Sequence, residues 1–203
     1  NNDKVLFNSF EFLVFLPIVF LLYWLVFKSL RWQNLFVVAA SYLFYGWWDW
    51  CFLILIAITT FCSFASGVWL EKCEGQRVRQ KWISASNILL NLVILCIFKY
   101  YNFFGENLAE LFSAFGMQLD WVTLDILLPV GISFYTFQAL SYTIDVYQHK
   151  IKPTRDVVAF FAFISFFPQL VAGPIERATH LLPQFLAPRT FSYEKAVDGM
   201  RQI

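Results

Sequence analysis

The stretch LPVGISFYTFQALSYTIDVY, residues 128–147, decides the fold class, because it is largely apolar and carries neither lysine nor arginine. Together with residue 127 it forms a run of about twenty residues, which is the length that a helix needs to cross a bilayer. The run contains Pro129 and Gly131. We therefore predict a membrane-spanning helix over residues 127–147.

One face of this predicted helix is polar. With a turn of about 100° per residue, seven positions lie within about 60° of Gln138, namely Gly131, Phe134, Tyr135, Gln138, Ser141, Tyr142 and Asp145. The opposite face carries Ile132, Leu140 and Ile144. Polar groups inside a membrane are costly unless they are paired or face water, so we expect the polar face to line a cavity in a helix bundle.

Two alternatives apply to single residues of this face. The first is that any single residue of the face is equally suited to a polar contact between neighbouring helices. Asp145 lies near the end of the run, where pairing with Lys150 or Lys152 at the membrane interface competes with a position in a cavity.

The composition of the whole chain agrees with a lipid environment. Of the 203 residues, 59% are hydrophobic and only 14% are charged, whereas soluble domains have about 45–50% and about 25%. Aromatic residues reach 21%, and Trp and Tyr favour the membrane–water boundary. The net charge of +1 gives no basic field that would attract nucleic acid. The sequence predicts an integral membrane protein with no nucleic-acid partner.

Apolar runs predict six spans, over residues 12–27, 35–45, 51–70, 83–98, 127–147 and 157–171. The second run is short for a complete crossing. Residues 105–116 repeat apolar side chains at i, i+3, i+4 and i+7, which predicts an amphipathic helix in the interface plane. A further apolar segment covers residues 181–186, and a new helix is expected from about Tyr193. The predicted fold is all-α: one polytopic transmembrane bundle, residues 1–203, with interfacial amphipathic helices.

Nine basic residues lie in the first, third and fifth of the loops between these spans: Lys28, Arg31, Lys72, Arg77, Arg79, Lys81, Lys150, Lys152 and Arg155. The intervening loops hold Lys99 and the acidic residues Asp49, Glu106, Glu110 and Asp120. Because basic loops face the cytoplasm, the N-terminus is expected outside.

The residues that usually carry chemistry are sparse. His149 and His180 are expected to be solvated surface residues, and neither has metal-ligand spacing. We interpret the four cysteines, Cys51, Cys62, Cys73 and Cys96, as buried thiols. No motif of a known hydrolase, metalloprotease or nucleotide-binding site is present.

A second informative stretch is FFPQLVAGPIER, residues 166–177. Pro168 and the pair Gly173-Pro174 are expected to break the sixth span and free backbone carbonyls. Irregular backbone at membrane depth persists only inside protein or beside a wet cavity. Gln169, Glu176 and Arg177 are candidates to satisfy it, and a simple kink that ends the span is the alternative.

Four segments carry a family resemblance. Residues 128–138 and 141–147 look like the signature of the bacterial membrane-bound O-acyltransferases, and residues 167–175 resemble their second signature. Residues 6–12, LFNSFEF, resemble the start of the alginate O-acetyltransferase-like branch. The branch that transfers D-alanine to teichoic acids shares much of the pattern.

This resemblance implies that an acyl group, with acetyl as the main candidate, is passed through the bilayer of the bacterial cytoplasmic membrane. The implied donor is a cytoplasmic thioester such as acetyl-CoA or an acyl carrier, with no bound cofactor. The implied acceptor is an extracytoplasmic polysaccharide or a partner acyltransferase, and an acyl carrier protein is a further candidate partner. The tunnel candidates are the seven residues of the polar face with Pro168, Gln169, Gly173, Pro174 and Arg177.

In the family, the catalytic histidine follows a stretch rich in aromatic residues and arginine, which lies beyond the position that matches residue 203. Neither His149 nor His180 matches this histidine. The chain is therefore expected to be the N-terminal half of the fold and inactive alone. A polytopic transporter or flippase, with the polar face as a substrate path, is the main alternative, although no internal repeat is visible. A scaffold membrane subunit is the third.

Overall fold

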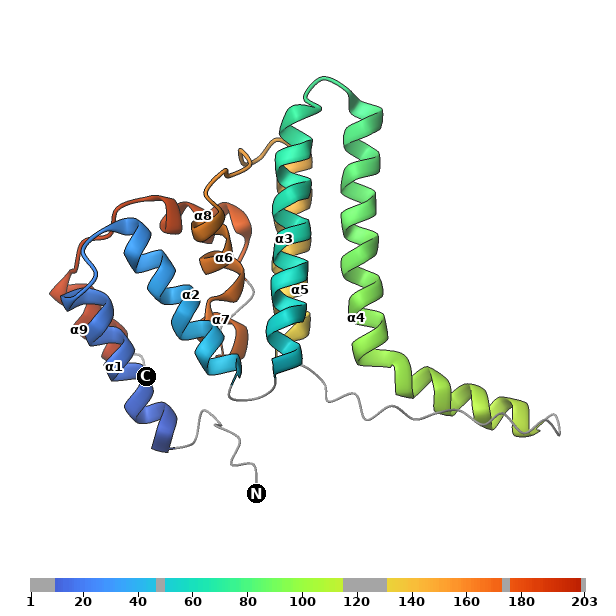
Figure 1. Ribbon diagram of the computed structural model, residues 1–203, viewed down its shortest axis with the longest axis horizontal. Coiled ribbons are helices and arrows are strands. Elements are labelled where there is room, and N and C mark those ends of the chain that lie inside the picture. Colours follow the sequence, from blue (N-terminus) through green and yellow to red (C-terminus); the bar gives the residue numbers. More distant parts are fainter. Residues whose placement is uncertain (1–9, 47–49, 115–130, 173–175, 202–203) are drawn as a thin grey trace.

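The computed structural model describes residues 10–46, 50–114, 131–172 and 176–201. Within these ranges every regular element is a helix, as Figure 1 shows. The helices are α1 (Phe10–Leu25), α2 (Leu30–Gly46), α3 (Trp50–Lys72), α4 (Arg77–Ala114), α5 (Ile132–Tyr147), α6 (Val157–Ser165), α7 (Phe167–Ala172), α8 (Ala178–Leu186) and α9 (Tyr193–Arg201). The predicted all-α fold is confirmed.

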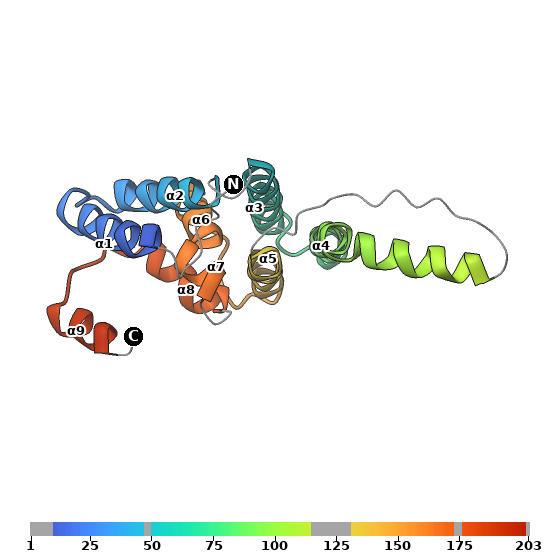
Figure 2. The same cartoon turned by 90° about the horizontal axis from the view of Figure 1, so that it is seen from below.

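The short helix α6 lies at the centre of one half of the bundle. It contacts α2, α3, α5 and α8, and its side chains Phe160, Phe163 and Ile164 are fully buried. In Figure 2, α6 and α7 lie between α2 and α8. Helices α3, α4 and α5 form the other half, in which α5 packs against both α3 and α4. Helices α3 and α5 both contact α6 and therefore join the two halves.

The bundle exposes apolar side chains and buries polar ones. Leu25, Ile54, Phe61 and Leu89 are each more than 60% exposed. In contrast, the interior includes polar residues with no exposed surface, among them Asn34, Ser41, Thr59, Thr60, Ser63 and Asn91. An apolar surface of this extent on a monomer requires a lipid or protein partner, and polar contacts between helices are typical of membrane bundles. These features agree with the lipid environment that the composition predicts.

Two helices in the described ranges are long and apolar enough to cross a membrane, over Leu53–Lys72 and Arg77–Tyr100. They correspond to the third and fourth predicted spans. Helices α1 and α5 have 16 residues each, so each rises about 24 Å, less than a hydrocarbon core of about 30 Å. The remaining four crossings stay a prediction.

The prediction that a separate interfacial helix begins at residue 105 is wrong. Helix α4 continues without interruption over 38 residues to Ala114, and residues 115 and 116 lie outside the described ranges. Lys99, expected in a loop, lies within α4, where its ammonium is 5.5 Å from the centroid of the Tyr100 ring. A single charge does not interrupt backbone hydrogen bonds, so the change in polarity did not mark a helix end.

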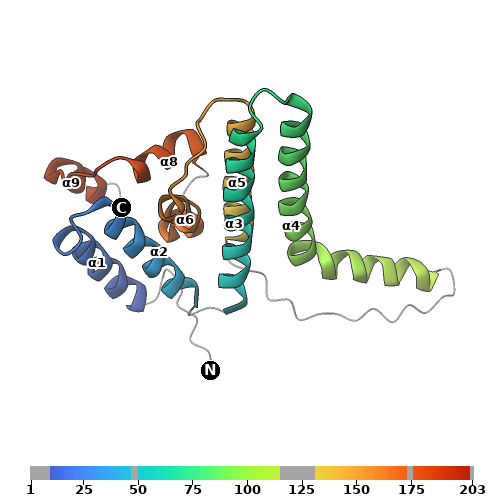
Figure 3. The ribbon, with the colours of Figure 1, turned by 45° about the horizontal axis from the view of Figure 1, so that its top comes forward.

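The predicted direction of this segment agrees with the structure. Figures 1 and 3 show that the C-terminal part of α4 bends sharply away from the direction of α3 and α5. It therefore lies across the bundle axis rather than along it.

Two of the basic loops lie at the same end of the bundle. The Arg155 Nε atom donates to Oε2 of Glu71 at 3.2 Å, which joins the loop between α5 and α6 to the end of α3. Figure 1 shows both loops at one edge of the helices. This arrangement agrees with the predicted alternation of loops, and the side of the membrane that they face stays a prediction.

The cysteine prediction is only partly right. Cys62 and Cys73 are free thiols and half-buried, whereas Cys96 is exposed. Cys96 lies on α4, whose main contacts among the described helices are with α3 and α5 and which exposes neighbouring side chains such as Val93 and Ile97. The side chain of Cys51 lies outside the described ones.

Candidate functional site

Helix α5 begins at a glycine that the fold requires. Gly131 is the N-cap residue and adopts the left-handed conformation, with φ 77°. A Cβ atom at this position would lie 3.1 Å from the carbonyl oxygen of Leu170 in α7. Gly131 therefore permits both the turn and the close approach of α7, and it precedes the helix instead of standing on its polar face. Residues 127–130 of the predicted span lie outside the described ranges.

The predicted polar face of α5 points into the bundle. Tyr135 and Tyr142 have no exposed surface, Gln138 is 1% exposed and Asp145 is 5% exposed. Phe134 and Ser141 are half-buried. Because α3, α4, α6 and α8 all contact α5, polar residues of this helix reach the interior instead of lipid.

The sequence assigned too many residues to the apolar face of α5 that meets the exterior. Ile132 and Leu140 are buried, at 2% and 8% exposure, and only Ile144 of the three predicted residues is exposed. Phe137, at 44%, belongs to the exposed side as well. The apolar face that meets the exterior is therefore narrower than the sequence pattern indicated, because four helices surround α5.

The amide of Gln138 is unusual in this interior. Neither its oxygen nor its nitrogen has a hydrogen-bond partner among the described residues, and the same is true of the hydroxyls of Tyr45, Tyr135 and Thr136. Buried polar groups are nearly always paired, so each exception calls for an explanation such as a bound water or a ligand. An amide offers two donors and an acceptor, which suits it to bind the carbonyl or hydroxyl of a substrate.

Paired side chains on the same helix give a contrast. Thr143 accepts a hydrogen bond of 2.7 Å from the amide of Asn87 on α4 and donates to the carbonyl of Ala139 at 3.0 Å. The first bond is an interhelical contact and the second lies within α5, and both are typical of a purely structural polar residue. Gln138 makes none of them, so polar contact between helices does not account for it within the described residues.

Ser141 connects the polar face to the beginning of α8. Its hydroxyl donates to Oδ2 of Asp145 at 3.4 Å and accepts the backbone N–H of Ala178 at 3.5 Å. Asp145 forms no ion pair with Lys150 or Lys152 among the described residues, so the pairing considered from the sequence is not what buries it. The two informative stretches of sequence therefore meet in space at Gly131 with α7, and Ser141 contacts the first residue after the second stretch, Ala178.

The break in the sixth span lies two residues before the predicted position. Helix α6 ends at Ser165, Phe166 has ψ 100°, and α7 begins at Phe167. Pro168 lies in the first turn of α7, where its missing N–H costs nothing. The freed N–H of Phe167 donates to the hydroxyl of Ser41 on α2 at 3.3 Å, a partner that the sequence did not suggest.

The other candidate residues of this stretch differ in burial. Gln169 is buried at 7% exposure, whereas Glu176 and Arg177 are exposed, so neither of the two charged side chains joins the buried polar face. Arg177 is the N-cap residue of α8. Gly173 and Pro174, also predicted for the site, lie outside the described residues.

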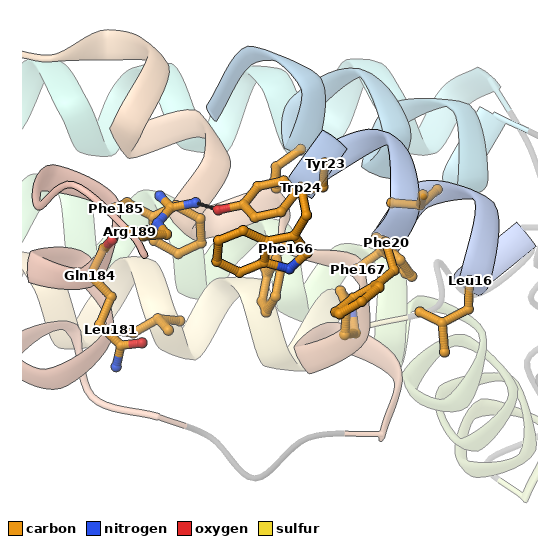
Figure 4. A pocket seen from close by; sticks show the side chains of 13 residues that line it. Leu16, Phe20, Tyr23, Trp24, Phe166, Phe167, Leu181, Gln184, Phe185 and Arg189 are labelled. Carbon is orange, nitrogen blue, oxygen red and sulfur yellow. Dashed lines mark hydrogen bonds between the residues drawn. The ribbon is translucent and has the colours of Figure 1, made fainter. Parts of the chain in front are cut away.

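Beside the break, a groove of about 270 Å³ opens between α1, α7 and α8, shown in Figure 4. Thirteen side chains line it, namely Leu16, Val19, Phe20, Tyr23, Trp24, Val37, Phe166, Phe167, Pro168, Leu181, Gln184, Phe185 and Arg189. Almost all of them are apolar or aromatic. The groove shares Pro168 with the predicted site, but α1 and Arg189 were not expected to take part.

Arg189 holds three helices together at one end of this groove. Its guanidinium donates to the carbonyl of Gln184 at 2.8 Å, to the hydroxyl of Tyr23 and to Oδ1 of Asn34, and it lies 4.8 Å from the centroid of the Phe185 ring. Asn34 in turn donates to the carbonyl of Phe185 at 2.8 Å. The arginine lies after α8, and no local pattern marked it.

Both histidines lie away from the buried polar face. His149 is exposed, has φ 58° and borders a polar cavity of about 350 Å³ with Glu71, Glu74 and Lys152. His180 is exposed on α8, with its Nδ1 3.8 Å from Oε2 of Glu176. The prediction that both are surface residues is confirmed.

Comparison with known proteins gives relatives in one functional group. No protein-family model matches the chain, and no solved structure matches it. A probable alginate O-acetylase of Pseudomonas aeruginosa is 41% identical over 194 residues, which cover 95% of this chain and 36% of that protein. The corresponding protein of Azotobacter vinelandii is 40% identical over 95% of this chain and 38% of its own length.

A more distant relative is named for a different polymer, peptidoglycan. A peptidoglycan O-acetyltransferase of Helicobacter pylori is 27% identical over 209 residues, which cover 89% of this chain and 38% of that protein. The chain thus spans a little over a third of the length of each of these relatives.

Proposed function

We propose that the whole protein is a membrane-bound O-acyltransferase in the branch of the alginate O-acetylases, to which this chain is homologous, and that it transfers an acetyl group to hydroxyls of an extracytoplasmic polysaccharide. The observation that carries the proposal is the identity of 41% along 95% of the chain. It is made for the whole protein because the chain spans 36% of that relative.

The reaction needs no bound cofactor. An acceptor hydroxyl attacks the carbonyl carbon of a cytoplasmic thioester, such as acetyl-CoA or an acetylated carrier. A C–O bond forms, the C–S bond breaks, and the thiol leaves with the proton that the hydroxyl gives up. A base beside the hydroxyl and donors beside the developing oxyanion accelerate such a step.

The buried polar face of α5 is our candidate for the wall of the acyl path. Gln138 carries the argument, because its amide is 1% exposed and has no partner among the described residues. Tyr135, one turn earlier on the same helix, adds a hydroxyl that has no partner among the described residues. Donors that are fixed in a dry interior bind a carbonyl oxygen more strongly than the same donors in water.

Neither histidine of this chain is our candidate for the base. Both side chains are exposed, whereas the amide of Gln138 is buried. His149→Gln and His180→Gln, introduced together into the whole protein, should leave the acetylation rate within about twofold of wild type, because surface substitutions remote from the chemistry change little. A loss of activity in this double variant would assign the base to one of them.

The proposed setting is the cytoplasmic membrane of a bacterium, with several spans and with the basic loops on the donor side. The polysaccharide, or a partner acyltransferase that accepts the acetyl group first, lies on the opposite side. An acyl carrier protein is a candidate donor partner at the basic loops.

The test follows the acyl group across a membrane. The whole protein is reconstituted in vesicles with radiolabelled acetyl-CoA on one side and polysaccharide on the other. The proposal predicts label in ester linkage on the polymer, released by mild base. Label that crosses the membrane without forming an ester would support the transporter alternative and contradict the acyltransferase.

A further inference from the structure

The groove between α1, α7 and α8 ends at a cation that has no carboxylate partner among the described residues. Three N–H groups of Arg189 bind neutral oxygens, those of Gln184, Tyr23 and Asn34. A guanidinium has five N–H groups, so two remain available. The side chain is half-buried, where water screens its charge less than at an open surface. This end of the groove therefore favours an anion.

The rest of the groove is apolar and faces the exterior of the bundle. Its α1 side chains, Leu16, Val19, Phe20, Tyr23 and Trp24, follow the spacing i, i+3, i+4, i+7, i+8. They form one stripe that runs about 12 Å along the helix. Leu16 is 38% exposed and Phe20 is 45% exposed, so the stripe is open to lipid.

Figure 4 shows the order of these parts. Leu16 lies at one end, Phe20, Phe166 and Phe167 lie between, and Arg189 lies at the other end. The groove thus has a charged end and an apolar body, which are the two features of a lipid molecule.

We propose that this groove binds an anionic phospholipid, with the phosphate at Arg189 and one acyl chain along α1. A volume of about 270 Å³ lies just below the range of about 300–1,000 Å³ for pockets that enclose a drug-sized ligand, which suits a single narrow chain. Arginine binds phosphate through paired hydrogen bonds. A zwitterionic lipid carries its own cation beside the phosphate, so its net attraction to Arg189 is weaker.

Native mass spectrometry tests this directly. The whole protein in detergent is given an equimolar mixture of phosphatidylglycerol and phosphatidylcholine, and the bound lipids are counted. Wild type should retain phosphatidylglycerol in about tenfold excess, as expected for one charge-assisted contact. Arg189→Gln should lose this preference, and Arg189→Lys should keep part of it.

Two further variants separate the apolar body from the charge. Leu16→Trp fills the groove and leaves Arg189 in place, so it should reduce the retention of both lipids. Arg79→Gln removes the same charge from an exposed position at the beginning of α4 and should keep the wild-type preference. If Arg189→Gln does not fold, Arg189→Lys and Leu16→Trp carry the test.

Two results would overturn the proposal. One is equal retention of the two lipids by wild type. The other is an unchanged preference for phosphatidylglycerol in both Arg189→Gln and Leu16→Trp, which would place the lipid elsewhere on the surface.

Discussion

The ring of Tyr142 on α5 occupies the space that a side chain at Gly67 on α3 would need. A Cβ atom at Gly67 would lie 2.9 Å from Cε1 of Tyr142 and 3.0 Å from Cζ. Tyr142 has no exposed surface, and its ring centroid lies 4.6 Å from that of Phe160 on α6. The absence of a side chain at Gly67 thus allows one tyrosine to connect α3, α5 and α6.

Gly67→Ala should therefore destabilise the protein by about 1–3 kcal/mol, the usual cost of overpacking, although alanine has the higher helix propensity. Thermal unfolding in detergent measures it. Gly46→Ala is the matched control, because its Cβ would meet only the end of the Leu53 side chain, at 3.2 Å. An unchanged or raised midpoint for Gly67→Ala would show that α3 and α5 separate easily.

The hydrogen bond between Asn87 and Thr143 should stabilise the contact of α4 with α5. Thr143→Val removes the acceptor of the 2.7 Å bond and should cost about 0.5–1.5 kcal/mol. Thr136→Val is the control on the same helix, because the buried Thr136 hydroxyl has no partner among the described residues and its removal should cost nothing. Equal losses in the two variants would contradict the assignment of the bond.

The sequence predicted most of the helices because apolar runs and breaks are local signals. It placed the break of the sixth span at Pro168, whereas the chain leaves the helix at Phe166 and proline occupies the next first turn. The burial of the α5 face was also predictable, because a polar stripe in an apolar helix must avoid lipid.

The groove was not predictable in the same way. Arg189 and its partners Tyr23 and Asn34 are 166 and 155 residues apart in sequence. An arginine in a polar segment is normally solvated, and no periodicity links it to α1. The packing of α1 against α2, and of α8 against α2 and α6, brings these groups together. Whether the Gln138 amide has a partner likewise depends on neighbours from other helices, and among the described residues it has none.

The predicted topology places the loops after α3 and α5 in the cytoplasm. Single cysteines at Glu74 and Gln148, in a chain whose own cysteines are replaced by serine, should resist an impermeant thiol reagent in intact cells. Both should react once the cells are opened. A cysteine at Asp49, in a loop predicted on the other side, should react without opening. Rapid labelling at both Glu74 and Gln148 in intact cells would reverse the orientation.

The central claim is that Gln138 serves the reaction and not the fold, and Gln138→Leu in the whole protein tests it. Leucine fills a similar volume and removes an amide that has no partner among the described residues, so the unfolding midpoint should stay the same or rise. Gln80→Leu is the control, because Gln80 is also buried but donates to the carbonyl of Leu70 at 3.2 Å. That variant should lose stability and keep its activity per folded molecule.

The decisive measurement is acetyl transfer by Gln138→Leu, normalised to folded protein. The account predicts a loss of roughly tenfold or more, as expected when a donor beside the reacting carbonyl is removed, with stability unchanged. Wild-type transfer per folded molecule, together with a lowered unfolding midpoint, would contradict it and would make Gln138 a structural residue of the bundle.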